Sequence, residues 1–133
     1  MDTVGPPQSE INSVITLFSS GKFDAALNAL KALTKNFPND SLLHNITGAC
    51  YAGLGQLPSA IQSYKKAISL NPKYEKAYYN LGGAYHEHGD HEKSVKSYEA
   101  SLSINPHYAE AYNNLGNVLS DSGMFDKAIN SFK

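Results

Sequence analysis

Apolar and small residues recur along this chain at the spacing of an amphipathic helix. In one block, Tyr78, Leu81 and Tyr85 stand three and four positions apart. Side chains with that spacing lie above one another on a single helix face, so each block predicts a helix with one buried side. A second block of the same kind, containing Val95 and Tyr98, follows after a short polar stretch. The chain therefore reads as a series of paired helices.

Glycine and proline punctuate these blocks with a period of 34 residues. The residues that keep this spacing are Gly21, Gly55, Gly89 and Gly123, together with Pro38, Pro72 and Pro106. The glycine follows the first block, where a left-handed backbone ends a helix, and the proline follows the second, where a helix cannot continue. Each period thus predicts a hairpin of two helices. Such a hairpin cannot bury its apolar faces alone, so neighbouring hairpins are expected to stack.

The period also predicts the organisation of the whole chain. We expect an N-terminal tail over residues 1–6, repeats over 7–40, 41–74 and 75–108, and an incomplete repeat over 109–133. The expected fold is all-α, with about seven to eight helices. Small residues at fixed places would let paired helices approach closely. These are Gly48, Gly82 and Gly116 in the first helices and Ala26, Ala60, Ser94 and Ala128 in the second helices.

The stretches "AYYNLGGAYHEHGDHEKSVKSYEASLSINP" and "AEAYNNLGNVLSDSGMFDKAINSF" carry a family resemblance. Their period and their aromatic, Leu, Gly and Pro places resemble the tetratricopeptide repeat (TPR) family, over residues 7–133. This resemblance implies a right-handed superhelical solenoid of antiparallel helix hairpins, whose first helices line a concave face. The departures are Glu10, Ser13 and Val14 in the first repeat, and His44 and Thr47 in the second. A degenerate first copy is typical of a terminal capping repeat.

Composition narrows the possible functions. The net charge is −1 and the chain contains no arginine, which argues against nucleic-acid binding and against carboxylate clamps. The single cysteine, Cys50, lies in an apolar-patterned stretch and is expected to be a buried, inert thiol. No apolar run approaches the length of a membrane span, and the start lacks a basic and apolar leader. We therefore expect no membrane partner and a cytoplasmic location, with a secreted mature domain as the alternative.

The stretch "AYHEHGDHEKS" concentrates potential metal ligands, but the repeat register places it at a turn between helices. Gly89 interrupts the sequence between His88 and His91, whereas a zinc protease motif needs an unbroken helix. We expect His91 to pack at a helix start and His86 and His88 to end the preceding helix. Adventitious Zn²⁺ or Ni²⁺ binding by these three histidines is the alternative. No phosphate-binding loop or nucleophile elbow is present, so we expect neither catalysis nor a cofactor.

The family resemblance places the working surface on the concave face of the first helices. Asparagine carries both a donor and an acceptor, so a row of asparagines there could bind the backbone of an extended peptide. Tyr79 would add an aromatic contact. The candidate groove residues are Asn45, Lys76, Tyr79, Asn80, Gly83, Asn113, Asn114 and Asn117.

Two TPR subtypes can be weighed at this face. Asn12, Asn80 and Asn114 stand where the TPR arms of O-linked N-acetylglucosamine transferases carry an asparagine ladder, although Ile46 interrupts it. The Hsp70/Hsp90 co-chaperone type needs a clamp of Lys, Arg and Asn. Neither possible frame of repeats supplies that clamp, so we reject this subtype.

The chain stops inside the second helix of its last repeat. Its final apolar residues, Phe125, Ala128, Ile129 and Phe132, are expected to form an open edge that self-associates or frays. The favoured function is a non-catalytic interaction module that binds a peptide or protein partner in the groove. The alternative is the targeting arm of a larger enzyme, such as a glycosyl- or sulfotransferase, with its catalytic domain beyond Lys133. A self-assembling scaffold is a third, weaker reading.

Overall fold

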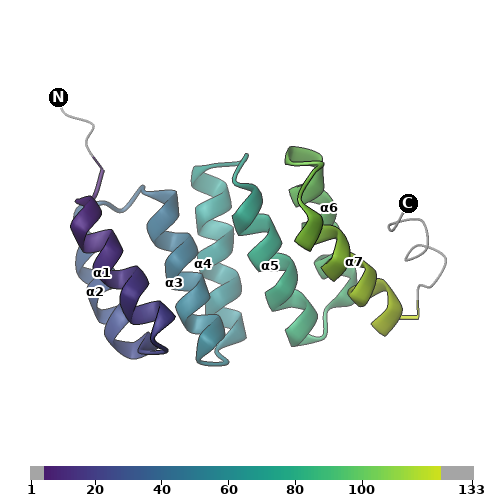
Figure 1. Ribbon diagram of the computed structural model, residues 1–133, viewed down its shortest axis with the longest axis horizontal. Coiled ribbons are helices and arrows are strands. Elements are labelled where there is room, and N and C mark those ends of the chain that lie inside the picture. Colours follow the sequence, from purple (N-terminus) through teal and green to yellow (C-terminus); the bar gives the residue numbers. More distant parts are fainter. Residues whose placement is uncertain (1–4, 124–133) are drawn as a thin grey trace. The chain divides into compact units, whose positions relative to one another are not determined.

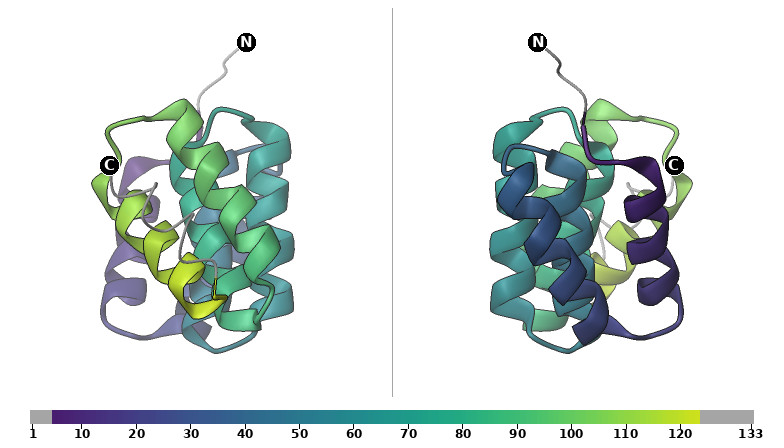
Figure 2. Two further views of the ribbon diagram at one scale, coloured as in Figure 1. Left: turned by 90° about the vertical axis from the view of Figure 1, so that its right-hand side faces the viewer. Right: turned by 90° about the vertical axis from the view of Figure 1, so that its left-hand side faces the viewer.

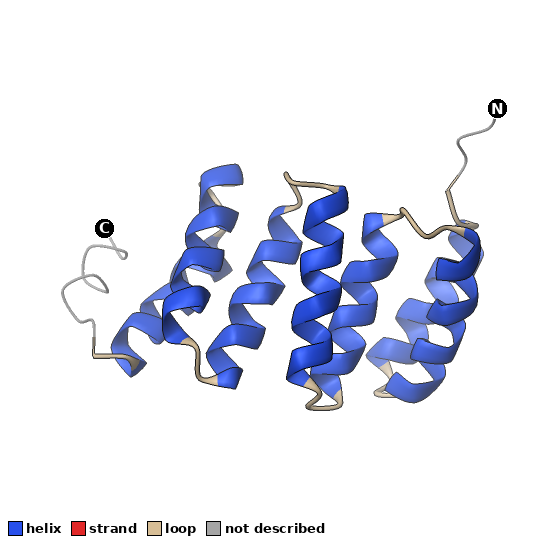
Figure 3. Ribbon diagram, turned by 180° about the vertical axis from the view of Figure 1, so that it is seen from behind, coloured by secondary structure: helices blue, strands red, loops and turns tan. Residues whose placement is uncertain are grey.

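The computed structural model describes residues 5–123, which form seven α-helices and no strand (Figures 1 and 3). The helices are α1 (Gln8–Ser19), α2 (Phe23–Asn36), α3 (Ser41–Gly53), α4 (Leu57–Leu70), α5 (Glu75–His88), α6 (His91–Ile104) and α7 (Ala109–Asp121). The chain divides into two compact units, Met1–Leu70 and Asn71–Lys133, called unit 1 and unit 2 below. Among residues 5–123, no helix is long and apolar enough to span a bilayer.

Unit 1 contains α1 to α4, and each helix packs against the next along the chain. The right-hand view of Figure 2 shows α1 beside α2. Its core consists of the apolar faces of α1, α2 and α3: Ile11, Val14, Ala26, Leu27, Leu30, Leu33, Leu43, Ile46 and Cys50. Cys50 is fully buried, as expected from its apolar surroundings, and this burial raises the pKa of its thiol to about 11. A thiol with that pKa stays protonated and unreactive near neutral pH.

Unit 2 contains α5, α6 and the described part of the last repeat, α7. Helix α6 packs against both α5 and α7, and α5 also contacts α7 (Figure 2, left). One core cluster joins α6 to α7 and consists of Val95, Tyr98, Leu102, Ala111, Leu115, Val118 and Leu119. The expected second helix of the last repeat, with the edge residues Phe125, Ala128, Ile129 and Phe132, lies outside the described residues.

The turns within and between hairpins confirm the predicted roles of glycine and proline. Gly21, Gly55, Gly89 and Gly123 all have positive φ, between 76° and 88°. Helices α2, α4 and α6 each end two residues before the proline of their repeat. Aspartate side chains cap two of the helix starts, where Asp40 accepts a hydrogen bond from the Leu43 amide and Asp90 accepts one from the Lys93 amide.

Paired helices approach closely at two of the small residues that the sequence singled out, Gly48 and Gly82. A Cβ atom added to Gly48 would lie 2.6 Å from the Tyr64 ring, and one added to Gly82 would lie 2.9 Å from the Tyr98 ring. Neither distance leaves room for a side chain, so both glycines are required by packing. The hairpins α3/α4 and α5/α6 are therefore each closed by a tyrosine ring lying on a glycine.

Candidate functional site

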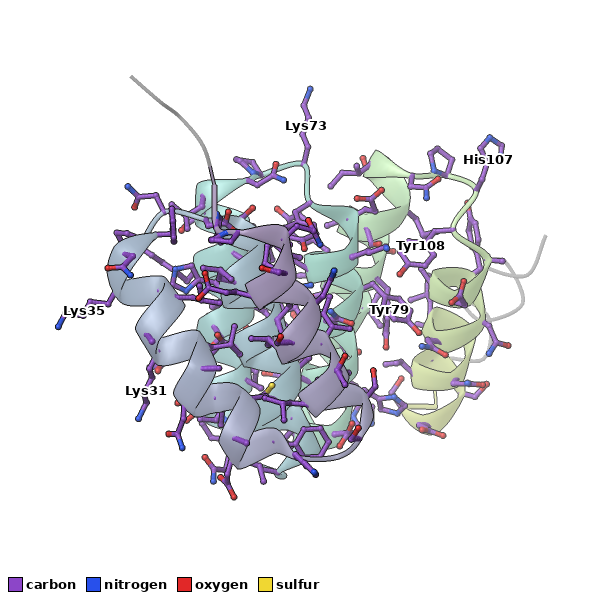
Figure 4. All side chains as sticks on the ribbon, turned by 60° about the vertical axis from the view of Figure 1, so that its left-hand side comes forward. Lys31, Lys35, Lys73, Tyr79, His107 and Tyr108 are labelled. Carbon is purple, nitrogen blue, oxygen red and sulfur yellow. The ribbon has the colours of Figure 1, made fainter. Side chains whose placement is uncertain are left out.

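The face of α5 and α7 in unit 2 brings two of the predicted groove residues together. Asn114 on α7 donates a hydrogen bond from Nδ2 to the Tyr79 hydroxyl on α5, with a distance of 2.9 Å. Figure 4 shows Tyr79 in the space between these two helices. The bond ties the two first helices of unit 2 together at the centre of the predicted binding face, and it fixes the orientation of the Asn114 amide.

Tyr79 is also held by two other tyrosines. Its ring stacks on Tyr108, with centroids 4.9 Å apart and planes 24° apart (Figure 4). It also meets the Tyr98 ring edge-on, with centroids 5.8 Å apart. Both arrangements are favourable for aromatic pairs. Burial, and after it the neighbouring Tyr79, raises the pKa of Tyr98 and of Tyr108 to about 12. Tyr98 and Tyr108 are therefore uncharged at neutral pH, and they support the Tyr79 ring through packing rather than acting as an acid or a base.

The remaining unit 2 candidates surround this cluster. Lys76, Asn113 and Asn117 are exposed, whereas Asn80 and Gly83 are half-buried. Asn80 already takes part in an interaction within the protein. A Cβ atom on Gly83 would lie 3.5 Å from the Tyr98 hydroxyl, an ordinary van der Waals distance, so the absence of a side chain leaves the Tyr98 hydroxyl next to bare backbone.

Sequence reasoning missed Tyr108 as part of this face. Tyr98 occupies a signature packing place and is buried there, only 2% exposed, where its ring contacts that of Tyr79. Tyr108 lies in the turn before α7 and was not singled out, although a tyrosine stands one period earlier at Tyr74, as in "NPKY" and "NPHY". That recurrence is the signal which could have identified it.

Unit 1 presents a different surface on the corresponding helices. Asn45, the groove candidate in this unit, is only 8% exposed and takes part in an interaction within the protein. By contrast, Ile15 on α1 and Leu42 on α3 are 42% and 37% exposed. Exposed aliphatic side chains therefore lie on α1 and α3 of unit 1, whereas α7 of unit 2 exposes the amides of Asn113 and Asn117.

The histidine stretch forms the turn that the register predicts. Helix α5 ends at His88, Gly89 adopts a left-handed backbone, and α6 begins at His91. His86 Nε2 lies 2.7 Å from Asp121 Oδ2 on α7, and its ring lies 5.6 Å from that of His91. Across residues 5–123, no group of three or more His, Cys, Asp or Glu side chains is placed to hold a metal ion.

Comparison with known proteins identifies the repeat. The TPR repeat family matches residues 48–89 and 83–123, which together make up more than half of the chain. The chain belongs to the TPR family. This assignment and the seven described helices confirm the predicted all-α fold of helical hairpins.

Three similar proteins show how TPR units of this kind occur elsewhere. The peroxisomal targeting signal receptor of Candida glabrata is 32% identical over 75 residues, which cover 56% of this chain and 13% of that protein. The crystal structure of MamA has a TM-score of 0.87 at 28% identity, covering 94% of this chain and 73% of that one. The first TPR of Spaghetti (RPAP3), bound to the HSP90 peptide SRMEEVD, has a TM-score of 0.83 at 24% identity, covering 92% and 99%. The chain therefore spans about an eighth of its curated relative's length.

The TPR register also defines the places where a carboxylate clamp would lie. They carry no arginine, because the chain has none. The rejection of the clamp subtype stays a prediction. Within the TPR pattern, the hydrogen-bonded tyrosine and asparagine pair in unit 2 is the feature that most clearly orders a possible binding face.

Proposed function

We propose that this TPR chain is a protein-interaction module, in which the α5 and α7 face of unit 2 binds an extended segment of a peptide or protein partner. The observation that carries the proposal is the Asn114 to Tyr79 hydrogen bond, because it fixes an amide and an aromatic ring side by side on neighbouring helices. A preformed site loses little conformational entropy on binding. The relatives support the same class of function, since one is a receptor for a targeting signal and one TPR structure holds a peptide.

Exposed asparagines extend this site along α7. Asn113 and Asn117 stand four positions apart, so their side chains lie one turn apart on the same helix face. Each amide can donate to a peptide carbonyl and accept from a peptide N–H. A ligand bound in this way is recognised mainly through its backbone, with Lys76 adding a positive charge at the start of α5.

The proposal assigns no chemical reaction to this TPR chain. The only cysteine is buried with its thiol pKa raised to about 11, and Tyr98 and Tyr108 have pKa values of about 12. A nucleophile or general base needs a pKa nearer to the working pH. An arm of a larger enzyme, a cytoplasmic location and self-association through the C-terminal edge stay predictions.

The experiment begins with selection of a heptapeptide display library on the immobilised full chain, with SRMEEVD as a fixed member. The affinity of the most enriched labelled peptide is then measured by fluorescence anisotropy. The variant Asn113→Ala with Asn117→Ala is expected to weaken binding about tenfold, since each removes contacts near the centre of the face. The matched control, Asn28→Ala with Asn39→Ala, removes two exposed asparagines of unit 1 and should leave the affinity unchanged.

Two results would contradict the proposal. The first is a library that yields no enriched peptide. The second is an enriched peptide whose affinity is unaffected by Asn113→Ala with Asn117→Ala. Circular dichroism of each variant would show that the helices are intact, because both pairs of side chains are exposed and have no core role.

A further inference from the structure

Unit 1 contains a pocket that the peptide-binding proposal does not use. It has a volume of about 410 Å³ and lies among α2, α3 and α4. Its lining residues are Leu27, Leu30, Lys31, Thr34 and Lys35 from α2, His44, Thr47 and Tyr51 from α3, and Ser59, Gln62 and Ser63 from α4. The volume falls in the usual range of small-molecule sites, roughly 300 to 1,000 Å³.

The pocket lies on the opposite side of α3 from the predicted peptide face. His44, Thr47 and Tyr51 are spaced three and four residues apart, so they share one helix face. Leu42 and Asn45, which belong to the predicted peptide face, are offset by about half a turn from them at roughly 100° per residue. A ligand in the pocket would therefore not compete directly with a peptide on that face.

The repeat register explains why a pocket forms at this place. Four lining positions carry smaller or more polar residues than the same places in later repeats. Leu30 stands where Tyr64 and Tyr98 follow, Thr34 where Ile68 and Leu102 follow, His44 where Tyr78 and Tyr112 follow, and Thr47 where Leu81 and Leu115 follow. Each change removes volume or apolar surface from the junction between repeats. The first junction is consequently hollow and polar where the family pattern would make it filled and apolar.

The charge of the lining is positive. Lys31 and Lys35 are one turn apart and project from the same side of α2 (Figure 4), and no lining residue is acidic. Within the described part of the chain, neither lysine has an ion-pair partner. Two ammonium groups without a carboxylate repel each other, and an anion bound between them relieves that repulsion.

Hydrogen-bond donors accompany these charges. Thr34, Ser59 and Gln62 have no side-chain hydrogen bond within residues 5–123, so their hydroxyl and amide groups are available to a ligand. Thr47 and Ser63 are different, because each donates its hydroxyl to a carbonyl of its own helix and retains only acceptor capacity.

His44 forms part of the same wall. Its Nε2 lies 2.9 Å from the Pro38 carbonyl oxygen, which can only accept a hydrogen bond, so Nε2 carries the proton and the ring is held in one orientation. Leu27, Leu30 and Tyr51 add apolar surface to the lining.

We propose that the α2/α3/α4 pocket of unit 1 binds a small organic anion, with a phosphate or carboxylate group between Lys31 and Lys35 and an apolar or aromatic portion against Leu27 and Tyr51. This site is independent of the peptide face in unit 2, and it does not rest on the proposed function. Such an anionic group can belong to a free metabolite or to a modified side chain of another protein. The pocket is assigned to a free small molecule because its volume suits one.

The test uses phenyl phosphate as the probe in isothermal titration calorimetry, with benzoate as the carboxylate analogue and phenol as the neutral analogue. The full chain is expected to bind phenyl phosphate or benzoate, but not phenol, with an affinity that falls as salt is raised. Lys31→Ala with Lys35→Ala should raise the Kd about tenfold or more, because charge-assisted hydrogen bonds are lost. The control Lys22→Ala with Lys73→Ala makes the same change in net charge at exposed lysines outside the pocket and should have little effect.

A second variant distinguishes binding inside the pocket from binding to the two lysines at its edge. Thr34→Leu with Thr47→Leu fills the cavity with the kind of residue that later repeats carry, and it leaves both lysines in place. The pocket proposal expects loss of binding with an unchanged or higher melting temperature. Binding that survives filling but disappears with the lysines would show an adventitious ion only. That result overturns the proposal, as does a wild-type chain that binds neither anion at millimolar concentration.

Modified proteins can be distinguished from free ligands in the same assay. A phosphoserine-containing heptapeptide that binds much more tightly than phenyl phosphate, and loses affinity in both variants, would overturn the assignment to a free small molecule. Equal or weaker binding of that peptide supports the assignment.

Discussion

Helices α2 and α6 occupy the same place in the repeat, two periods apart, yet they fill their cores differently. The buried face of α2 presents Ala26, Leu30 and Leu33. The same three places in α6 hold Ser94, Tyr98 and Ser101, and all three are also buried. At these three places α2 packs through aliphatic side chains, whereas α6 packs through one large ring and two hydroxyl groups.

The hydroxyls of α6 are satisfied by backbone carbonyls of α5. Ser94 donates to the Gly82 carbonyl oxygen at 2.7 Å, and Ser101 donates to that of Glu75 at 2.9 Å. Across the described residues, no buried side-chain nitrogen or oxygen lacks a hydrogen-bond partner. Unit 2 therefore gains directional interactions between paired helices without leaving a buried polar group unpaired, which would be costly.

The difference shows which parts of the repeat are fixed by geometry and which are not. The close approach of ring to glycine is present in both units, at Gly48 with Tyr64 and at Gly82 with Tyr98. The other buried places tolerate changes of size and polarity. In unit 1 this freedom leaves a pocket beside α2, while in unit 2 the same freedom supplies the hydrogen bonds of Ser94 and Ser101.

The largest effect is expected from removing the ring that distinguishes α6. Tyr98→Ala should lower the free energy of unfolding by about 3 to 5 kcal/mol, because it deletes a buried aromatic side chain and leaves a cavity beside Gly82. Urea unfolding followed by far-ultraviolet circular dichroism measures the change. Tyr112→Ala removes a ring that is 36% exposed, and its smaller cost serves as the control. Equal losses from the two substitutions would contradict the central role of Tyr98.

Alkaline pH should weaken unit 2 through the same residue. In the unfolded chain a tyrosine ionises near its ordinary pKa of about 10, whereas in the folded chain the pKa of Tyr98 is about 12. Its contribution is therefore complete below pH 10 and is lost as pH rises from 10 through 12, by an amount on the order of 2 kcal/mol. Tyr98→Phe should flatten the dependence of unfolding free energy on pH in this window. Urea unfolding at a series of pH values through this window measures the slope, and an unchanged slope in Tyr98→Phe would contradict the prediction.

The contact between glycine and ring can be tested with neighbouring glycines on one helix. Gly82→Ala places a Cβ atom 2.9 Å from the Tyr98 ring and should cost about 1 to 3 kcal/mol through overpacking. Gly83→Ala places one 3.5 Å from the Tyr98 hydroxyl and should stabilise the helix by up to about 1 kcal/mol. Thermal unfolding of both variants makes the comparison. A stabilising Gly82→Ala would show that α5 and α6 can separate without cost.

The smallest effect is expected from replacing Ser94 of α6 with alanine, the residue that stands at the same place in α2. Ser94→Ala removes the bond to the Gly82 carbonyl and should cost roughly 1 kcal/mol. Ser103→Ala, at an exposed position of the same helix, is the matched control and should be neutral. If Ser94→Ala changed the free energy of unfolding as little as its control does, the Ser94 hydroxyl would contribute nothing to the stability of unit 2.

The helices and turns could be predicted from sequence because they depend on local backbone requirements. A positive φ at Gly89 and the end of α6 before Pro106 are needed whatever the neighbouring repeat contains. The stacking of Tyr79 on Tyr108 could not be predicted in this way. It depends on how closely α7 and its preceding turn approach α5, which is a property of packing between repeats.

The pocket of unit 1 could not be predicted from the sequence either. His44 and Thr47 were recognised as departures from the repeat pattern, but a departure predicts a cavity only if the surrounding helices do not close over the missing volume. Likewise, the register predicts Asn114 on the peptide face without revealing that its amide is bonded to Tyr79. The contacts of each side chain therefore had to come from the packing between helices.

The tyrosine cluster of unit 2 also gives the protein an intrinsic spectroscopic probe. The chain has no tryptophan, so its near-ultraviolet signals come largely from tyrosine. Tyr79 and Tyr108 are stacked closely enough for their electronic transitions to couple, and Tyr98 holds the pair in a fixed, chiral setting. Near-ultraviolet circular dichroism should therefore be especially sensitive to the junction between α5 and α7. Loosening of that junction could be followed in time without attaching any dye.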